Sequence, residues 1–360
     1  MISVLKDWFH RYFSDPQAIV LTVLLLGGFT IVLTLGSMLA PVLGSMVIAY
    51  LLEGPIYQLE KRHVPRLVAV TFVYLIFLTT LLFIIFGLIP LLSRQVTQLV
   101  LELPNMVVQG RQLLLELPGR YPALISTDQV YEITGRLKTE LGSLGQQVLS
   151  FSLSSIPGLI TLTVYLILLP LLVFFFLKDK QSIVDWFTSF LPKERSLATR
   201  VWREMDQQIG NYVRGKFWEI LIVGASTYVT FQLMGLNYAP LLAVVVGLSV
   251  IIPYIGATVV TFPIALVAFF QWGWGEQFGW LVGAYLIIQA VDGNVLVPLL
   301  FSEAVNLHPI AIIVAVLVFG GLWGLWGVFF AIPLATLVKV LLSAWPRARS
   351  APAAERLPAL

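Results

Sequence analysis

The sequence predicts an all-α integral membrane protein, and three features of the chain lead to that fold class. Hydrophobic residues occupy 58% of the 360 positions and charged residues only 11%, whereas soluble domains carry about 25% charged residues. The apolar residues gather in runs of the length that a membrane-spanning helix needs, about 20 residues. Two longer runs near the C-terminus are interrupted at matching places. We therefore expect six full transmembrane helices plus two re-entrant helical hairpins, or eight spans, with a small α-helical extracytoplasmic segment.

The composition also excludes several classes of function. Lysine and arginine number 22 against 19 aspartates and glutamates, and they flank the apolar runs, so the basic balance indicates membrane topology and not nucleic-acid binding. No cysteine is present, and His10, His63 and His308 lie far apart without the spacing of a metal site. No phosphate-binding loop of the Gly-x-x-x-x-Gly-Lys-Ser/Thr type occurs. We expect neither an enzyme nor a cofactor-binding protein.

Residues 1–90 are expected to hold an interfacial helix and three transmembrane helices. Residues 1–17 are amphipathic and should lie on the membrane surface, and Pro16 favours the first turn of the helix that follows. The full spans predicted for the whole chain lie at 18–36, 37–52, 67–90, 157–177, 217–236 and 279–299. Residues 151–216 thus combine the fourth span with a basic linker.

The basic residues orient these spans. Of the 22 lysines and arginines, 17 lie in 1–17, 53–66, 178–216 and the tail from 339, and the other five lie in 91–150. Because lysine and arginine are enriched on the cytoplasmic side of membrane proteins, we expect both termini, including the tail 341–360, in the cytoplasm. The segment 91–150 is then outside.

The segment 91–150 is expected to form short amphipathic helices. Apolar residues at helical spacing make one stripe over 92–103 and a second over 107–117, with Pro104 between them. A third helix is expected over 127–149. Such helices need something to pack on, and two partners remain open: the membrane surface or the transmembrane bundle, or another subunit.

An internal repeat in the C-terminal half is the most informative pattern. Residues 217–270 and 279–340 each hold one span and one broken apolar run. The runs begin at Asn237-Tyr238-Ala239-Pro240 and Asn306-Leu307-His308-Pro309, break at Ile252-Pro253-Tyr254-Ile255-Gly256 and Gly320-Gly321-Leu322-Trp323-Gly324, and resume through Pro263 and Pro333. Arms of about 12 residues cover about 18 Å each, too short to cross a bilayer.

A re-entrant hairpin after each span would make an inverted-topology repeat, the arrangement by which many secondary transporters place a substrate site at the membrane midplane. Two continuous crossings remain the alternative. The charge rule does not choose between them, because the loops 271–278 and 300–308 contain no lysine or arginine.

Polar residues inside the spans are the candidate transport site. Asp292 is the charged residue deepest in a span, with Gln289 one turn before it and Asn294 just beyond it. An ionised carboxylate in a membrane must be paired, hydrated or neutralised, so we expect either a cation, proton or polar-substrate site or a helix–helix hydrogen bond. The other candidates that line the path are the hairpin tips and the asparagines before the broken runs: Pro253, Tyr254, Gly256, Gly320, Gly321, Gly324, Asn237 and Asn306.

Several of these residues also have a structural interpretation. Asn237 and Asn306 are expected to cap the broken helices. The Gly320-x-x-x-Gly324 pattern is typical of close helix packing. Glu219 follows Arg214 and Lys216 and is expected to form an ion pair at the cytoplasmic edge of its span.

Several motifs together resemble one family. They are Gln208-x-x-x-Tyr212-x-x-Gly215, Ile252-Pro253-Tyr254-Ile255-Gly256, Asp292-x-Asn294-x-x-x-Pro298 and Ala331-Ile332-Pro333-Leu334-Ala335. In this combination the chain resembles the autoinducer-2 exporter family of bacterial permeases, in its PerM-like branch, over nearly its whole length. Where members often have glutamate before the asparagine, this chain has Asp292, which keeps the carboxylate and shortens its reach.

The resemblance implies a homo-oligomeric transporter of the bacterial inner membrane, in contact with lipid. It implies export of a small polar solute such as a signalling molecule, or exchange of sodium for protons. From the residues alone, a gradient-driven or passive transporter is the first hypothesis. A non-transporting membrane scaffold or regulatory protein that holds partners through 91–150 and 178–216 is the alternative.

Overall fold

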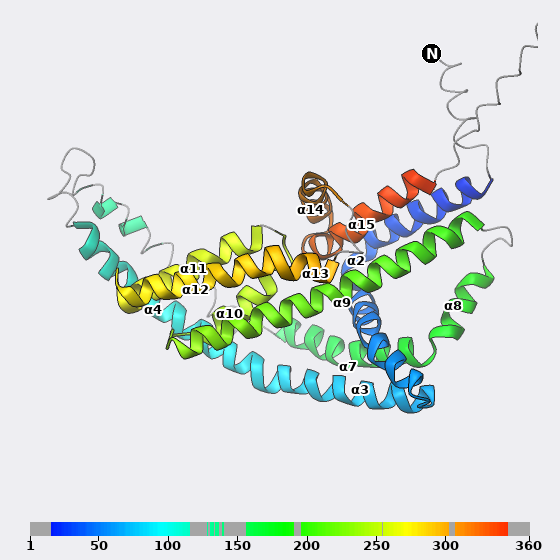
Figure 1. Cartoon of the computed structure of the whole chain (residues 1–360), viewed down its shortest axis with the longest axis horizontal. Coiled ribbons are helices and arrows are strands. Elements are labelled where there is room, and N and C mark those ends of the chain that lie inside the picture. Colours follow the sequence, from blue (N-terminus) through cyan, green and yellow to red (C-terminus); the bar gives the residue numbers. More distant parts are fainter. Residues whose placement is uncertain are drawn as a thin grey trace, which may run out of the picture. The chain divides into compact units, whose positions relative to one another are not determined.

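The computed structural model is helical throughout its regular elements (Figure 1), and no strand occurs in the residues that it describes. These are 16–115, 156–190, 196–253, 255–301 and 307–344, with several positions between 128 and 139. The all-α prediction is therefore confirmed for the described residues. The predicted interfacial helix over 1–17 lies almost wholly outside them, as do Tyr254, Asn306 and most of the predicted helix over 127–149.

The chain divides into two compact units. Unit 1 consists of Met1–Leu43, Asp179–Val213 and Glu303–Leu360, and unit 2 consists of Gly44–Lys178 and Arg214–Ser302. Two long helices, α2 (Pro16–Lys61) and α9 (Ser196–Leu233), each contribute residues to both units. The two broken runs of the predicted repeat fall in different units.

Helix α2 differs from the prediction, because it runs through both of the first two predicted spans without a break. At 46 residues it is about 69 Å long if straight. Its end is a Schellman turn: His63 has φ 65°, Val64 N donates to Leu59 O at 3.2 Å, and His63 N donates to Glu60 O at 2.9 Å. Pro65 follows this turn. Helical hydrogen bonds join neighbouring turns and can continue past the edge of a bilayer. The length of an apolar run therefore predicts how many spans it could form, but not where the helix stops.

The predicted interruption at Pro104 is also absent. Helix α3 (Arg66–Phe83), the π-helical turn η1 (Ile84–Leu88) and α4 (Ile89–Leu115) follow one another as one 50-residue helical segment, with Pro104 inside α4. Such a segment measures about 75 Å, far more than a hydrocarbon core of about 30 Å. The amphipathic part of α4 therefore extends the preceding apolar helix and is not a separate short helix.

A first core of unit 2 joins α2, α3 and α7 (Ile156–Lys178), with α3 packed along α7 (Figure 1). Its buried residues are Ala49, Ile56, Ala69, Val70, Val73, Val173 and Leu177. At one end of this core the Arg66 guanidinium donates to Glu60 at 3.1 Å and to the Leu177 carbonyl at 3.1 Å. Arg66 thus joins the ends of all three helices. Beyond α7, the short helix α8 (Lys180–Ser189) belongs to unit 1.

The second core of unit 2 forms around a helical hairpin. Helices α10 (Ala239–Ser249) and α11 (Ile255–Trp272) pack against each other, and α11 packs on α12 (Glu276–Val291). The buried side chains are Val223, Phe231, Leu236, Ala239, Leu242, Val246, Val250, Val260, Ile264, Val267, Ala268, Leu281 and Tyr285. Gly224 of α9 and Gly247 of α10 are in backbone contact, which lets these two helices approach closely.

The predicted break in the first run is present, because α10 ends at Ser249 and α11 begins at Ile255, and both outer ends of the hairpin are joined. The Asn237 N–H donates to Gln271 Oε1 at 2.8 Å, and Gln271 Nε2 donates to the Gly235 carbonyl at 2.7 Å. Gly256 faces the last turn of α10, where a Cβ would overlap the Ser249 carbonyl. Residues 239–272 therefore fold back on themselves and do not form one continuous rod.

The prediction that Asn237 caps α10 is wrong. The capping position is Tyr238, with φ 59° and no side-chain hydrogen bond of its own. Gln95 of α4 instead accepts from the Leu241 N–H at 2.9 Å. This bond and the packing of Leu99 on the second core show that α4 rests on the helical bundle, which is one of the packing partners that the sequence left open.

The second run also forms a hairpin, in unit 1. Helices α14 (Pro309–Trp323) and α15 (Leu325–Ala344) pack against each other and are separated by Gly324, with φ 59°. Two helices joined by one residue can pack together only if the chain reverses. His308 caps α14 by accepting from the Ile310 N–H at 3.3 Å, a role that the sequence predicted for Asn306.

Unit 1 packs this second hairpin on the first part of α9. Leu21 of α2, Val201 and Met205 of α9 and Val340 of α15 form its buried core. The Tyr212 hydroxyl donates to the Phe329 carbonyl at 3.0 Å. Each hairpin is therefore held by a segment of α9, although the two lie in different units.

Candidate functional site

Asp292 lies where α12 changes its winding. It opens the π-helical turn η2 (Asp292–Leu296), which leads into the short helix α13 (Val297–Phe301). Only 8% of the Asp292 surface is exposed, although the residues that follow it in η2 are exposed or half-buried. A π-turn inserts an extra residue into a helix and often marks a functional position. The carboxylate is therefore buried at an irregular point of an otherwise apolar helix.

A buried ion pair lies in the same unit. Lys216 Nζ is 2.7 Å from Glu219 Oε2, and the two side chains are 4% and 3% exposed. The residues are three apart on α9, so their side chains share one face of the helix. The predicted ion pair of Glu219 is confirmed, and it is far more buried than a pair at a membrane edge would be.

Lys216 also holds the tip of the first hairpin. Its ammonium donates to the Val250 carbonyl at 2.6 Å, at the point where α10 has ended and left carbonyl groups without helical partners. The same ammonium lies 5.4 Å from the centre of the Phe301 ring. Gly215 permits this arrangement, because a Cβ there would be 2.7 Å from Phe301 Cε1. One side chain thus connects α9, the hairpin tip and α13.

Lys216, Glu219 and Asp292 together carry a net charge of −1 when all three are ionised. Lys216 acts electrostatically on Asp292, and Asp292 acts on Glu219. With all three groups ionised, one ammonium faces two carboxylates. Among the described residues, neither Asp292 Oδ1 nor the nearby buried Gln289 Nε2 has a hydrogen-bond partner. We call Lys216, Glu219 and Asp292 the charged cluster.

The residues that the sequence grouped as one path belong to both units. Asp292 belongs to the charged cluster and the hairpin tip is bonded to it through Lys216, while Pro253 is half-buried in that tip. Asn294 is exposed, and its amide donates to the Ala290 carbonyl of its own helix at 2.8 Å. The residues predicted at the second hairpin tip, Gly320, Gly321 and Gly324, lie in unit 1.

The sequence prediction missed contacts of two residues, Lys216 and Gly327. The sequence predicts an ion pair of Glu219 beside Lys216 at the edge of a span, but no local pattern indicates the contacts of Lys216 with the Val250 carbonyl and the Phe301 ring. Gly327 was not singled out, yet a Cβ there would overlap the Phe319 carbonyl across the second hairpin. Gly321, which was singled out, has open space around it.

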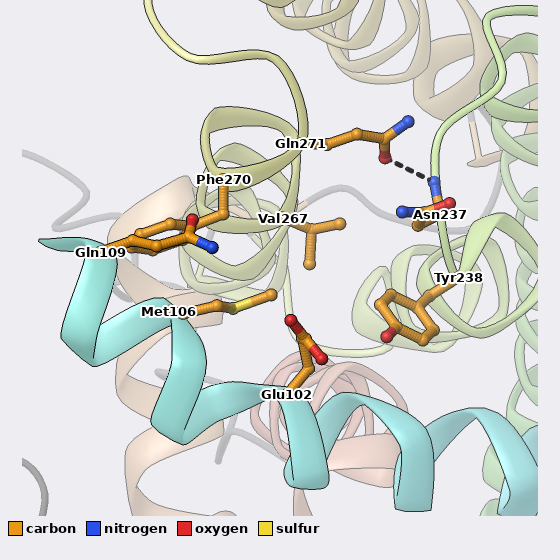
Figure 2. A pocket seen from close by; sticks show the side chains of 8 residues that line it. All are labelled: Glu102, Met106, Gln109, Asn237, Tyr238, Val267, Phe270 and Gln271. Carbon is orange, nitrogen blue, oxygen red and sulfur yellow. Dashed lines mark hydrogen bonds between the residues drawn. The ribbon is translucent and has the colours of Figure 1, made fainter.

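A pocket of about 250 Å³ lies at the base of the first hairpin, between α4 and the outer ends of α10 and α11. Its lining residues are Glu102, Met106, Gln109, Asn237, Tyr238, Val267, Phe270 and Gln271. Figure 2 shows the Glu102 carboxylate directed into the space between Met106 and Tyr238. Burial and the Glu102 charge raise the pKa of Tyr238 above its ordinary value of 10.0, so the hydroxyl stays protonated at neutral pH.

The fold and the buried charges define the class of protein. Four of the described helices are long and apolar enough to cross a membrane: Met38–Lys61, Arg66–Leu115, Ile255–Trp272 and Glu276–Phe301. With the shorter apolar helices around them, they make this a multi-pass membrane protein. Its buried charges lie among apolar helices, as is typical of proteins that move solutes.

Comparison with known proteins gives the family. Residues 19–347 match the family described as "AI-2E family transporter", and the chain belongs to that family. It is 48% identical over 346 residues, 96% of this chain and 98% of the other, to the Escherichia coli (strain K12) protein called "Putative permease PerM". It is 28% identical over 297 residues, 81% of this chain and 80% of the other, to the Bacillus subtilis (strain 168) protein called "Putative transport protein YueF".

Proposed function

We propose that this protein is a gradient-driven transporter of the bacterial inner membrane that exports a small polar solute or exchanges sodium for protons at the charged cluster. The observation that carries the proposal is the contact between this cluster and the first hairpin. The buried ammonium of Lys216 neutralises one of two carboxylates and at the same time holds the Val250 carbonyl at the hairpin tip. A change of charge at the cluster therefore acts directly on the tip of the first hairpin.

The charge balance favours a positively charged or proton-carrying substrate. A buried carboxylate without a partner is costly in an apolar environment. The excess negative charge of the cluster is removed by one proton or one monovalent cation at Asp292. When that charge arrives, the attraction between Lys216 and the carboxylates weakens, and the ammonium is freer to leave the Val250 carbonyl.

The hairpins are proposed to be re-entrant. Helix α10 has 11 residues, or about 16 Å, so it does not cross the membrane by itself. The hydrogen bonds of Gln271 to Asn237 and Gly235 hold the two outer ends of the first hairpin together, so both ends lie on the same side of the membrane. With the span that precedes each hairpin, this arrangement supports two inverted repeats, 217–270 and 279–340, with both termini in the cytoplasm and subunits assembled as a homo-oligomer.

The topology is testable by cysteine labelling, because the native chain contains no cysteine. Single cysteines at positions 237 and 275 are expected to react with a membrane-impermeant maleimide from the same, periplasmic side. A cysteine at position 304 is expected to react from the cytoplasm. Labelling of 237 and 275 from opposite sides would show that the run between them crosses the membrane.

The role of Asp292 is testable in proteoliposomes that contain a pH-sensitive dye. A pulse of external sodium chloride is expected to change the internal pH with the wild-type protein, and Asp292→Asn is expected to reduce this change to the level of protein-free liposomes. Glu276→Gln, which changes an exposed carboxylate of α12, is the matched control. Gel filtration and thermal unfolding check that both variants fold. An unchanged flux in Asp292→Asn would remove this residue from the mechanism.

A further inference from the structure

We propose that the pocket at the base of the first hairpin is a binding site for a small organic cation. This site is separate from the charged cluster, because it lies at the outer ends of α10 and α11, whereas the cluster holds their tip. The proposal does not depend on the transport function.

The charge of the pocket selects a cation. Of the eight described residues that line it, Glu102 alone is charged, and the structure gives its carboxylate no ion pair or hydrogen bond with any described residue. The side chain is partly buried and points into the pocket (Figure 2). A partly desolvated carboxylate attracts a positive ligand and repels an anion.

The remaining lining residues favour an organic cation over a metal ion. The rings of Tyr238 and Phe270 belong to the wall, and Met106 and Val267 are 7% and 3% exposed. Aromatic rings with a nearby carboxylate are the usual environment of protein-bound ammonium groups. A divalent ion would need several oxygen ligands, and no group of three or more metal-binding side chains occurs among the described residues.

The polar groups of the pocket are in place before a ligand binds. Gln271 uses its amide to hold the Asn237 backbone and the Gly235 carbonyl, so one polar edge of the pocket is positioned before a ligand arrives. The amides of Asn237 and Gln109 are on exposed residues and are available for a hydroxyl or ammonium group. The pocket has a volume of about 250 Å³, whereas sites for drug-sized ligands measure roughly 300–1,000 Å³. Its size therefore favours a ligand smaller than a drug molecule.

The location is compatible with access from water. Glu102 lies 36 residues after Arg66 in one helical segment, or about 54 Å along it. This exceeds a hydrocarbon core of about 30 Å. If Arg66 is at the cytoplasmic edge, as the charge distribution predicts, the pocket opens beyond the opposite edge of the core.

The test uses choline and its uncharged isostere 3,3-dimethylbutan-1-ol, which have nearly the same shape. Binding to the full-length protein in detergent is measured by isothermal titration calorimetry at constant ionic strength. Saturable binding of choline is expected, with the alcohol about tenfold weaker or worse. Glu102→Gln is expected to weaken choline binding about tenfold and to leave the alcohol unchanged.

Three further variants keep the result interpretable. Phe270→Leu is expected to weaken choline binding about two- to fivefold, as the loss of a cation–π contact requires. Glu276→Gln and Asp292→Asn are expected to bind choline as the wild type does, the latter because the pocket is independent of the charged cluster. Equal binding of choline and the alcohol, undiminished binding in Glu102→Gln, or no binding of choline at tens of millimolar would each overturn the proposal.

Discussion

Lys216 and Glu219 form an ion pair of 2.7 Å one turn apart on α9, and both side chains are more than nine-tenths buried. A buried ion pair by itself adds little to stability, because desolvation of both charges offsets most of their attraction. Here the ammonium has a third contact, the Val250 carbonyl. The ion pair therefore has no net charge, and its ammonium also attaches the tip of the first hairpin to α9.

Removing one member of this pair should be more damaging than removing both. Lys216→Met leaves two buried carboxylates without their cation and should lower the free energy of unfolding by about 3–5 kcal/mol. Lys216→Met combined with Glu219→Leu should recover part of that loss, because no unpaired Glu219 remains. Thermal unfolding of the purified variants in detergent measures both effects. A double variant less stable than Lys216→Met would contradict the pairing.

Gly256 should not tolerate a methyl group. A Cβ at this position overlaps the Ser249 carbonyl, which is backbone and cannot rotate away, so Gly256→Ala should cost about 1–3 kcal/mol and displace the hairpin tip. Gly283 lies inside α12 with nothing within 4 Å of an added Cβ. Gly283→Ala is the matched control and should be neutral or stabilising by up to about 1 kcal/mol. Equal melting temperatures of the two variants would argue against this close contact.

The second hairpin allows the same comparison within one helix pair. Gly327→Ala should destabilise the protein, because the new methyl meets the Phe319 carbonyl, whereas Gly321→Ala has open space. The expected difference is again about 1–3 kcal/mol in the free energy of unfolding. Denaturant titration followed by tryptophan fluorescence is a suitable measurement, since Trp323 lies beside the turn. A greater loss of stability in Gly321→Ala than in Gly327→Ala would refute the close backbone contact at Gly327.

Gln271 should stabilise the base of the first hairpin. Gln271→Ala removes two hydrogen bonds, one to the Asn237 N–H and one to the Gly235 carbonyl, each contributing about 0.5–1.5 kcal/mol. Gln232→Ala changes an exposed glutamine of α9 and should have little effect. Hydrogen exchange at Asn237 gives a local readout: faster exchange is expected in Gln271→Ala alone, and equal rates in both variants would show that Gln271 does not hold this end.

The predictions from sequence succeeded where the signal was local. The break between α10 and α11 follows from Pro253 within an apolar run and from Gly256 as the second residue of the next helix. The pairing of Lys216 with Glu219 follows from their spacing on one helix. By contrast, two predicted boundaries were wrong: α2 continues past residue 36, and α4 continues through Pro104. In both cases the sequence carried no signal strong enough to show whether the helix would stop.

The assignment of caps failed for a related reason. Asparagine is a good capping residue by local propensity, but α10 receives its cap from Gln95 of α4, which is 146 positions away in the chain. No local pattern indicates such a partner. Likewise, Asn294 has the right residue type beside Asp292 but bonds to its own helix, because the π-turn changes which side chains share a face.

The sequence by itself determined that this chain is a helical membrane protein with two broken apolar runs, since hydrophobic content, helix period and helix-breaking residues are properties of neighbouring positions. Only the tertiary structure decided which charges are buried together. Lys216, Val250 and Phe301 come from separate parts of the chain, and their contacts depend on the packing of α9 against the hairpin and α13. Because Lys216 is buried, its ammonium interacts strongly with Glu219 and with the Val250 carbonyl at the hairpin tip. Electrostatic interactions are stronger where water is excluded.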